Sequence, residues 1–397
     1  MSIRWNSGGR RAAAWRAAIG TTVLAAAAAV LVASASGALG PHDADAATPP
    51  AGSAPAASTP ATPAVLSSAI RSPRHMSATV LTHLPTSVAD PTRGVAIRLN
   101  GSPRLNTPRP KLTPDTAGTW TNLGNYEFFR PVSTLEPCTK YTMVIPAATA
   151  AKAHRHLGVS RTVSFDVACP GITAVQEALA RLNYLPYTLH GFVGASSTAA
   201  MTRAEATKRA FVLPHGILKA NVPGAPPLTM GDLDPTTTGA MEVFEGDHNL
   251  PIGTTITSRF WRVLMAEETL AKGNPHPYTW VTVTKTLPET LDVHEGAKIA
   301  LSTPANTGVP GADTQDGIFP IYIRYLSTTM TGTNVDGSHY VDPGIPWVNY
   351  FNGGDAVHGY IRPGYGYPQS NGCVELPIST AQTVYGMLAL GDLVIVS

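Results

Sequence analysis

The sequence lacks the local motifs that mark most metal and cofactor sites. Its 12 histidines and three cysteines never form an H-E-x-x-H pattern or paired C-x-x-C spacings, which are common zinc signatures. It also contains no glycine-rich phosphate loop and no dinucleotide-binding fingerprint. We therefore expect no metal and no cofactor.

A strong charge of either sign is also missing. Lys and Arg total 28 against 26 Asp and Glu, which gives a formal net charge of +2. A protein that binds the phosphate backbone needs a basic patch or stripe. Nucleic acid is therefore not an expected partner.

Residues 1–39 have the layout of an export signal. Arginines up to Arg16 precede an apolar run of Ala, Val and Leu from Ala17 to Ala35, with small residues suited to cleavage. The run is also long enough to span a bilayer, so an uncleaved membrane anchor is an alternative. Residues 40–74 are rich in Pro, Ala, Ser and Thr and predict a flexible linker. We expect an exported protein of the cell wall or extracellular space.

Residues 75–170 predict a small β-sandwich. The runs Gly94–Leu99, Tyr141–Ile145 and Thr162–Val167 are short, partly alternating and rich in β-branched residues, with Pro, Gly and Asn between them. The sequence around Trp120 and Phe128–Pro131 resembles bacterial immunoglobulin-like modules of cell-surface proteins. A spacer without a ligand of its own is the alternative role for this domain.

The three cysteines divide into a predicted pair and one odd thiol. Cys138 and Cys169 flank the strand-like stretches of the β domain, and disulfides persist in exported chains. We predict that these two cysteines form a disulfide. Cys373 is then unpaired, and it is either intermolecular or reactive.

Cys373 lies in a stretch that could supply a nucleophile and its base. The sequence from His358 to Leu376 is H-G-Y-I-R-P-G-Y-G-Y-P-Q-S-N-G-C-V-E-L. A thiol nucleophile needs a base within hydrogen-bond reach, and a glycine before it allows a tight turn that aims backbone N–H groups at an oxyanion. A buried structural cysteine and a core histidine are the alternative, but the polar, glycine-rich surroundings favour a catalytic pair.

These residues resemble the catalytic domain of the L,D-transpeptidase family. The resemblance rests on the His-Gly pair His358-Gly359, the S-x-G-C-V-x-L segment, and a closing helix and strand that end at Gly391–Val396. It implies that Cys373 is acylated by a peptidoglycan stem peptide and that His358 is its base. The resemblance also implies that the backbone amides of Gly372 and Cys373 are the oxyanion donors, and that Ser370, Asn371, Gly372 and Gly359 belong to the oxyanion site and its loop.

Two positions depart from the family pattern. The family usually has His at the position of Asn371, and Asn cannot carry a proton as His does. It often has Arg or Asn at the position of Glu375. The Cys373–His358 pair itself is intact.

Residues 171–272 predict a helical domain with an insert. Val175, Ala178, Leu179 and Leu182 follow the helical period of an amphipathic helix. The sequence resembles small three-helix peptidoglycan-binding modules, which implies glycan strands as a possible partner. An insert from Phe192 to Thr237 departs from that family, so a module that only positions the catalytic domain is the alternative.

Residues 277–397 predict the catalytic domain, with short strands and one closing helix. Overall we expect a multidomain, mainly β chain: an immunoglobulin-like β-sandwich, a small helical module, and a mixed β-sheet L,D-transpeptidase domain. Cys373 is expected to precede the helix, whose start could lower the thiol pKa. Among the nearby aromatic residues, Tyr340 and Trp347 are candidates for a stem-peptide groove.

The resemblance implies a cysteine acyltransferase that cross-links peptidoglycan stem peptides, which serve as acyl donor and acceptor. With water as acceptor, the same site would be an L,D-carboxypeptidase. The alternative from another class is a non-catalytic wall-binding protein in which Asn371 marks lost activity. Acylation of Cys373 by a carbapenem inhibitor would separate the enzyme from the binding protein.

Overall fold

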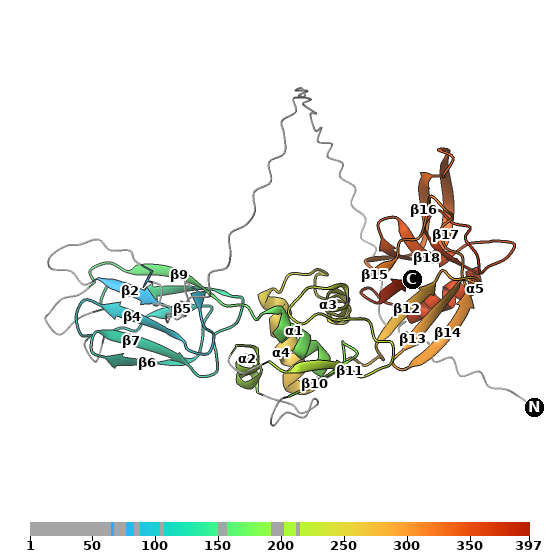
Figure 1. The fold of residues 1–397 in the computed structure, drawn as a ribbon. Coiled ribbons are helices and arrows are strands. Elements are labelled where there is room, and N and C mark those ends of the chain that lie inside the picture. Colours follow the sequence, from blue (N-terminus) through green and yellow to red (C-terminus); the bar gives the residue numbers. More distant parts are fainter. Residues whose placement is uncertain are drawn as a thin grey trace, which may run out of the picture. The chain divides into compact units, whose positions relative to one another are not determined.

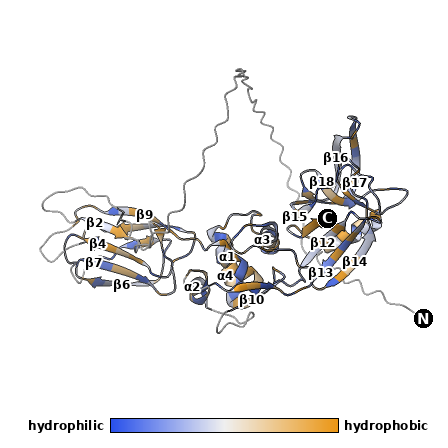
Figure 2. Ribbon diagram, in the orientation of Figure 1, coloured by the Kyte–Doolittle hydropathy of each residue, from blue (hydrophilic) through white to orange (hydrophobic). Residues whose placement is uncertain are grey.

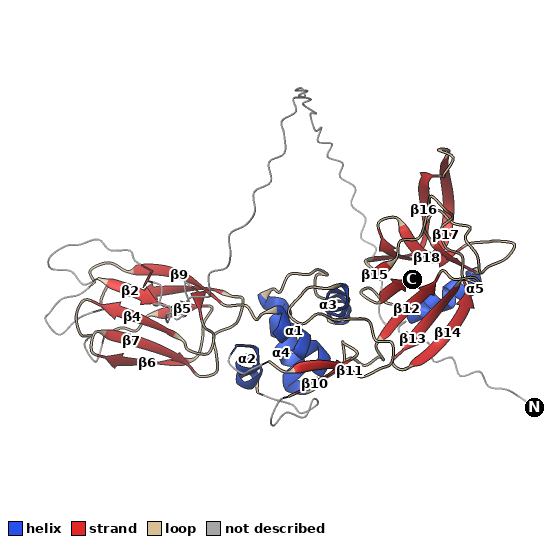
Figure 3. Cartoon of the chain, in the orientation of Figure 1, coloured by secondary structure: helices blue, strands red, loops and turns tan. Residues whose placement is uncertain are grey.

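The computed structural model describes residues 65–66, 77–82, 88–103, 107–149, 157–191, 202–211 and 215–397. The predicted export segment 1–39 lies outside these residues, as does almost all of the predicted linker 40–74. No helix within the described ranges combines the length and apolar character needed to cross a membrane. Figure 1 shows the chain as a ribbon, and Figure 3 separates its helices from its strands.

Among the described residues between 65 and 167, nine strands form two mostly antiparallel sheets. The first sheet has the order β1-β2-β4-β7-β6, and the second has the order β3-β9-β8-β5. Their bounds are β1 Val65–Leu66, β2 Ala78–Leu81, β3 Val88–Ala89, β4 Val95–Leu99, β5 Lys111–Thr113, β6 Gly118–Leu123, β7 Tyr126–Pro131, β8 Lys140–Ile145 and β9 Arg161–Val167.

One hydrophobic core joins these two sheets. In β8 the buried residues Tyr141, Met143 and Ile145 alternate with more exposed ones, which is the period-2 pattern of a strand with one buried face. Residues of the first sheet, including Ile97, belong to the same core. Cys138 and Cys169 form a disulfide, which confirms the predicted pairing, and Cys373 is the free cysteine.

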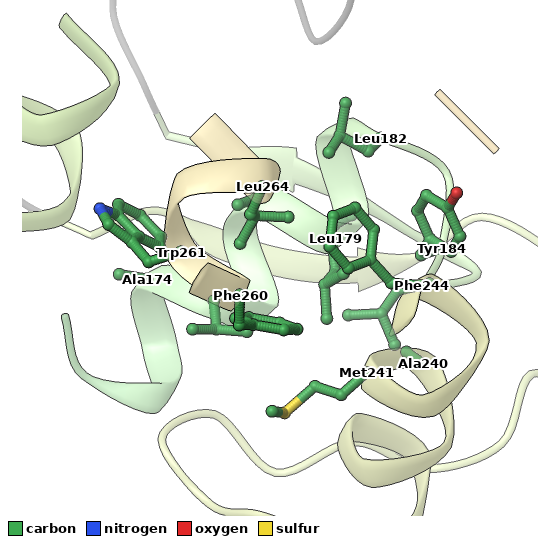
Figure 4. Close-up of a cluster of buried hydrophobic side chains, with 14 of the residues drawn as sticks. Ala174, Leu179, Leu182, Tyr184, Ala240, Met241, Phe244, Phe260, Trp261 and Leu264 are labelled. Carbon is green, nitrogen blue, oxygen red and sulfur yellow. The ribbon is translucent and has the colours of Figure 1, made fainter. Parts of the chain in front are cut away.

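In the part of residues 171–272 that the structure describes, four helices and a two-stranded sheet follow. Their bounds are α1 Ile172–Arg181, β10 Tyr187–His190, α2 Arg203–Phe211, β11 Ile217–Ala220, α3 Pro235–Asp247 and α4 Ser258–Leu270. Val175, Ala178, Leu179 and Leu182 are all buried, as their spacing predicts. Figure 4 shows Leu179 and Leu182 in a cluster with residues of α3 and α4.

Side-chain caps fix where two of these helices begin. The carboxylate of Asp234 accepts the Thr237 N–H at 2.7 Å, and Pro235 occupies the first turn of α3. The hydroxyl of Thr257 accepts the Phe260 N–H at 3.0 Å at the start of α4. Both arrangements satisfy N–H groups that have no partner within the helix.

The C-terminal region contains two further sheets and one helix. The five-stranded sheet has the order β14-β13-β12-β20-β15, and the four-stranded sheet has the order β16-β17-β18-β19. The bounds are β12 Thr279–Thr284, β13 Thr290–Glu295, β14 Lys298–Pro304, β15 Gly317–Pro320, β16 Ile323–Thr333, β17 His339–Asn352, β18 Asp355–Gly359, β19 Val374–Leu376, α5 Ile378–Met387 and β20 Leu393–Val396.

The last strand of the chain lies inside the five-stranded sheet. β20 pairs in parallel with β12 and antiparallel with β15. Trp280, Val281 and Val283 of β12 are completely buried, and much of this strand is hydrophobic in Figure 2. Residues from both sheets and from α5 share one core. This core packs against the four-stranded sheet, which carries His358 on β18 and has Cys373 directly before β19.

Candidate active site

Two parallel strands bring the predicted nucleophile and base together. Val357 of β18 pairs with Val374 of β19, and His358 pairs with Glu375. Because side chains alternate along a strand, His358, Glu375 and Cys373 project from one face. Val357 and Val374 project from the other face into the core.

Cys373 and His358 line the same cavity. Its lining residues come from the β16–β17 hairpin, from β18 and the segment that follows it, and from the segment that leads into β19 together with β19 itself. The lining residues are Met330, Tyr340, Asp342, Ile345, His358, Tyr360, Arg362, Ser370, Asn371, Cys373 and Glu375. The cavity therefore places a thiol and an imidazole where one substrate could contact both.

The imidazole of His358 is held in a defined orientation. The side chain is 3% exposed, and Nδ1 lies 3.1 Å from the carbonyl oxygen of Gly359. A carbonyl can only accept, so Nδ1 carries the proton and Nε2 has a free lone pair. Burial lowers the pKa of His358, because the charged form is poorly solvated, while the Gly359 carbonyl opposes this shift. The neutral ring is therefore the resting form and can accept a proton.

The thiol of Cys373 is neutral at rest. Burial raises its pKa to about 12, and the Asp355 and Glu375 carboxylates act in the same direction. A hydrogen bond with the Ala356 backbone lowers the pKa in part. A neutral thiol must lose its proton during attack, so the nearby base is required for chemistry.

The prediction that the start of the helix lowers the pKa of the Cys373 thiol is wrong, because this pKa is raised. β19 separates Cys373 from α5, which begins at Ile378. The field of a helix terminus falls off within about one turn, and burial dominates here instead. The structure thus favours base-assisted attack over a preformed thiolate.

The turn before Cys373 is fixed by hydrogen bonds on both sides. Ser370 Oγ donates to the Cys373 carbonyl at 2.6 Å and accepts the Gly372 N–H at 3.2 Å. Thr314 Oγ1 donates to the Gly372 carbonyl at 2.8 Å. An oxyanion bound by the Gly372 amide would therefore compete with Ser370 for that N–H.

Gly372 has a conformation and a contact that favour glycine. Its φ is +114°, and a Cβ there would lie 2.3 Å from Asp355 Oδ1. A larger residue would collide with this carboxylate and strain the backbone. The glycine thus allows the loop to pass directly over the start of β18.

Asn371 and Gly359 help to position neighbouring segments of the chain, and neither side chain can carry a proton. Asn371 Nδ2 donates to Asn334 Oδ1 at 2.7 Å, which ties the loop before the thiol to the turn of the β16–β17 hairpin. At Gly359 a Cβ would lie 3.2 Å from the backbone of Ile378. This glycine therefore lets the start of α5 pack closely on β18.

The two aromatic groove candidates lie in different places. Tyr340 lines the cavity with Cys373. Trp347 is not among the lining residues; it packs against the catalytic-domain core, and its ring centroid is 5.7 Å from that of Tyr385. Only Tyr340 is therefore positioned to contact a ligand in this cavity.

Sequence reasoning missed Asp342 and Arg362 and treated Glu375 only as a departure. Arg362 Nε and Nη2 donate to the two oxygens of Glu375, each at 2.7 Å. Tyr360 donates to Asp342 at 3.4 Å. The charge reversal at position 375 was the available signal for a partner of opposite charge nearby.

Asp355 is a further charged group that sequence reasoning missed. Burial raises its pKa to about 6, so the folded state disfavours the ionised carboxylate. The associated cost to stability is present above the folded pKa and vanishes as pH falls toward the lower unfolded pKa.

We expect Asp355→Asn to stabilise the protein at pH 8 but not at pH 4. Because the group is half-buried and partly screened, the gain is on the order of 1 kcal/mol, or a few degrees in melting temperature. Thermal unfolding of both proteins at the two pH values measures this. An equal shift at both pH values, or a loss at pH 8, would contradict the assigned burial of this charge.

No group of three or more His, Cys, Asp and Glu side chains in the described ranges has the arrangement of a metal site.

The sequence of residues 278–396 matches the family model described as the L,D-transpeptidase catalytic domain. No curated protein sequence matches the chain. The matched range contains the candidate pair: His358 on β18, and Cys373 directly before β19.

Several solved structures are also similar. The catalytic domain of the Enterococcus faecium L,D-transpeptidase has 26% identity and a TM-score of 0.28; the match covers 31% of this chain and all of that one. L,D-transpeptidase 3 from Mycobacterium tuberculosis, in complex with a faropenem-derived adduct, has 13% identity and a TM-score of 0.28, with 79% and 96% covered. The L,D-transpeptidase from Mycobacterium smegmatis has 12% identity and a TM-score of 0.27, with 85% and 100% covered.

Residues 278–396 of this chain form an L,D-transpeptidase catalytic domain.

Proposed function

We propose that this protein cross-links peptidoglycan stem peptides through a thioester on Cys373. The observation that carries the proposal is the shared cavity of Cys373 and His358 within the matched catalytic domain. The neutral state of both groups supports it, because a neutral imidazole can take the proton of a neutral thiol.

The first half-reaction forms the acyl-enzyme. His358 Nε2 removes the thiol proton as Sγ attacks the carbonyl carbon that precedes the terminal D-Ala of a tetrapeptide stem. The tetrahedral intermediate collapses, and the C–N bond breaks. The leaving amine takes the proton from His358, so the products are a thioester and free D-Ala.

The second half-reaction releases the acyl group. The side-chain amine of a diamino acid on a neighbouring stem attacks the thioester carbonyl and gives a proton to His358. The C–S bond breaks, and Sγ recovers that proton. Water in place of the amine would give a free carboxylate, which is the L,D-carboxypeptidase alternative.

The other segments have proposed roles that follow from their sequence resemblance. Residues 1–39 would direct export or anchor the chain, and the linker 40–74 would give it reach. The immunoglobulin-like β domain would act as a spacer, and residues 171–272 would contact glycan strands or position the catalytic domain. A carbapenem would acylate Cys373, because its strained amide resembles the donor bond.

Incubation with tetrapeptide-bearing muropeptides tests the reaction. Transpeptidation gives a cross-linked dimer and one D-Ala for each bond formed. Tripeptide products with no dimer would establish the carboxypeptidase instead. Unchanged muropeptides together with tight retention on intact wall would show a binding protein.

A further inference from the structure

Arg362 presents a fixed guanidinium group in the catalytic cavity. Nε and Nη2 are held by Glu375, and Nη2 also donates to the Gln369 carbonyl at 3.0 Å. The guanidinium carbon lies 4.6 Å from the ring centroid of Tyr360. These contacts fix three sides of a group that would otherwise have many rotamers.

One nitrogen of Arg362 remains available. Nη1 makes no hydrogen bond to any residue that the structure describes, while the side chain as a whole is 28% exposed. The Glu375 side chain that holds Arg362 is only 5% exposed. The buried carboxylate therefore orients the arginine, which lines the cavity and keeps Nη1 free of these bonds.

The position of Arg362 relative to the thiol fits a substrate contact. Glu375 is two residues after Cys373 on the same strand face, a step of about 6.6 Å along an extended chain. Arg362 contacts Glu375 and lines the cavity together with Cys373 and His358. Because these residues border one cavity, a ligand that reacts with Cys373 can place an atom a few bonds from its reacting carbonyl beside Arg362.

The donor stem has an anion at that distance. In a tetrapeptide the leaving residue ends in a carboxylate, and its carbon is three bonds from the scissile carbonyl carbon. In a pentapeptide this carboxylate is one residue further away. We propose that Arg362 binds the terminal carboxylate of the leaving D-residue and so selects tetrapeptide donors; this inference rests on the proposed function.

The other charges in the cavity limit how strongly Arg362 can favour a substrate with a free terminal carboxylate. Glu375 neutralises Arg362 in part, and the carboxylate of Asp342 also lines the cavity. A single charge-assisted hydrogen bond from Nη1 is therefore the expected contact. Such a bond corresponds to a preference of about 10- to 100-fold.

The test compares a tetrapeptide donor with the same peptide carrying a C-terminal amide. We measure kcat/KM for release of D-Ala or D-Ala-amide by the full chain, with a pentapeptide as third substrate. The wild type is expected to favour the free acid by about 10- to 100-fold. Arg362→Gln should lose this preference through a fall in the rate with the acid, while the rate with the amide falls much less.

Glu375→Gln is the matched variant, because it breaks the same ion pair from the other side. It keeps the positive charge of Arg362, so the preference for the acid should persist. If the ion pair only stabilises the loop, kcat/KM should fall equally for the acid and the amide in both variants, and that result would overturn the inference. The double variant, with both residues changed to Gln, avoids an unpaired buried carboxylate and should also lack the preference.

The outcomes separate this inference from the proposed function. Equal cleavage of acid and amide by the wild type would contradict the role of Arg362 in binding the carboxylate, but it would not contradict the proposed transpeptidase function. Failure of the wild type to cleave any of the three donors would contradict the proposed function itself.

Discussion

Replacing Cys373 by alanine is expected to abolish both acylation and cross-linking. The other two cysteines are joined in a disulfide, so no second thiol can take over. The side chain lies in the cavity with His358, and its loss leaves the base without a nucleophile. Product formation is measured as dimeric muropeptide and released D-Ala.

Cys373→Ser serves as the matched control for this variant. It keeps the shape of the side chain, but a hydroxyl is a far weaker nucleophile than a thiolate. A normal thermal transition in both variants would show that the fold is retained. Dimer formed by the alanine variant would rule out a mechanism through Cys373.

Replacing His358 by alanine is expected to lower the acylation rate by about 10²- to 10⁴-fold, the range of a general-base contribution. The effect should lie near the upper end, because burial raises the thiol pKa to about 12 and little thiolate exists at neutral pH. Stopped-flow measurement of carbapenem acylation gives the rate directly. An unchanged rate would remove His358 from the mechanism.

His358→Gln is the control for packing in the His358 experiment. Its amide can still donate to the Gly359 carbonyl but cannot accept a proton from the thiol. Both variants should therefore lose a similar factor in rate. In the wild type, the rate should fall only below about pH 6.5, because burial lowers the pKa at which His358 becomes protonated.

The sequence predicted that Cys373 and His358 lie close together, because that prediction depends on local spacing. The glycine before Cys373 and the His-Gly pair at the end of a strand are both local features, and the structure places Cys373 and His358 in the lining of one cavity. The alternation of buried and exposed residues in β8 likewise predicts a strand from local sequence, and the two flanking cysteines predict their disulfide. These predictions needed no knowledge of distant parts of the chain.

The parts that could not be predicted depend on contacts across the fold. The thiol pKa follows from burial by several segments, and a short strand lies between Cys373 and the helix. Trp347 packs against α5 instead of facing the cavity, and an aromatic residue alone does not reveal its direction. The Arg362–Glu375 pair joins positions that only the closed loop brings together.

The mass of the intact protein after treatment with a carbapenem shows directly whether Cys373 is the nucleophile. We expect one adduct for each chain, located by peptide mapping on the segment that contains Cys373, and absent from the Cys373→Ala variant. An unmodified wild-type protein, or an adduct on any other residue, would contradict Cys373 as the nucleophile.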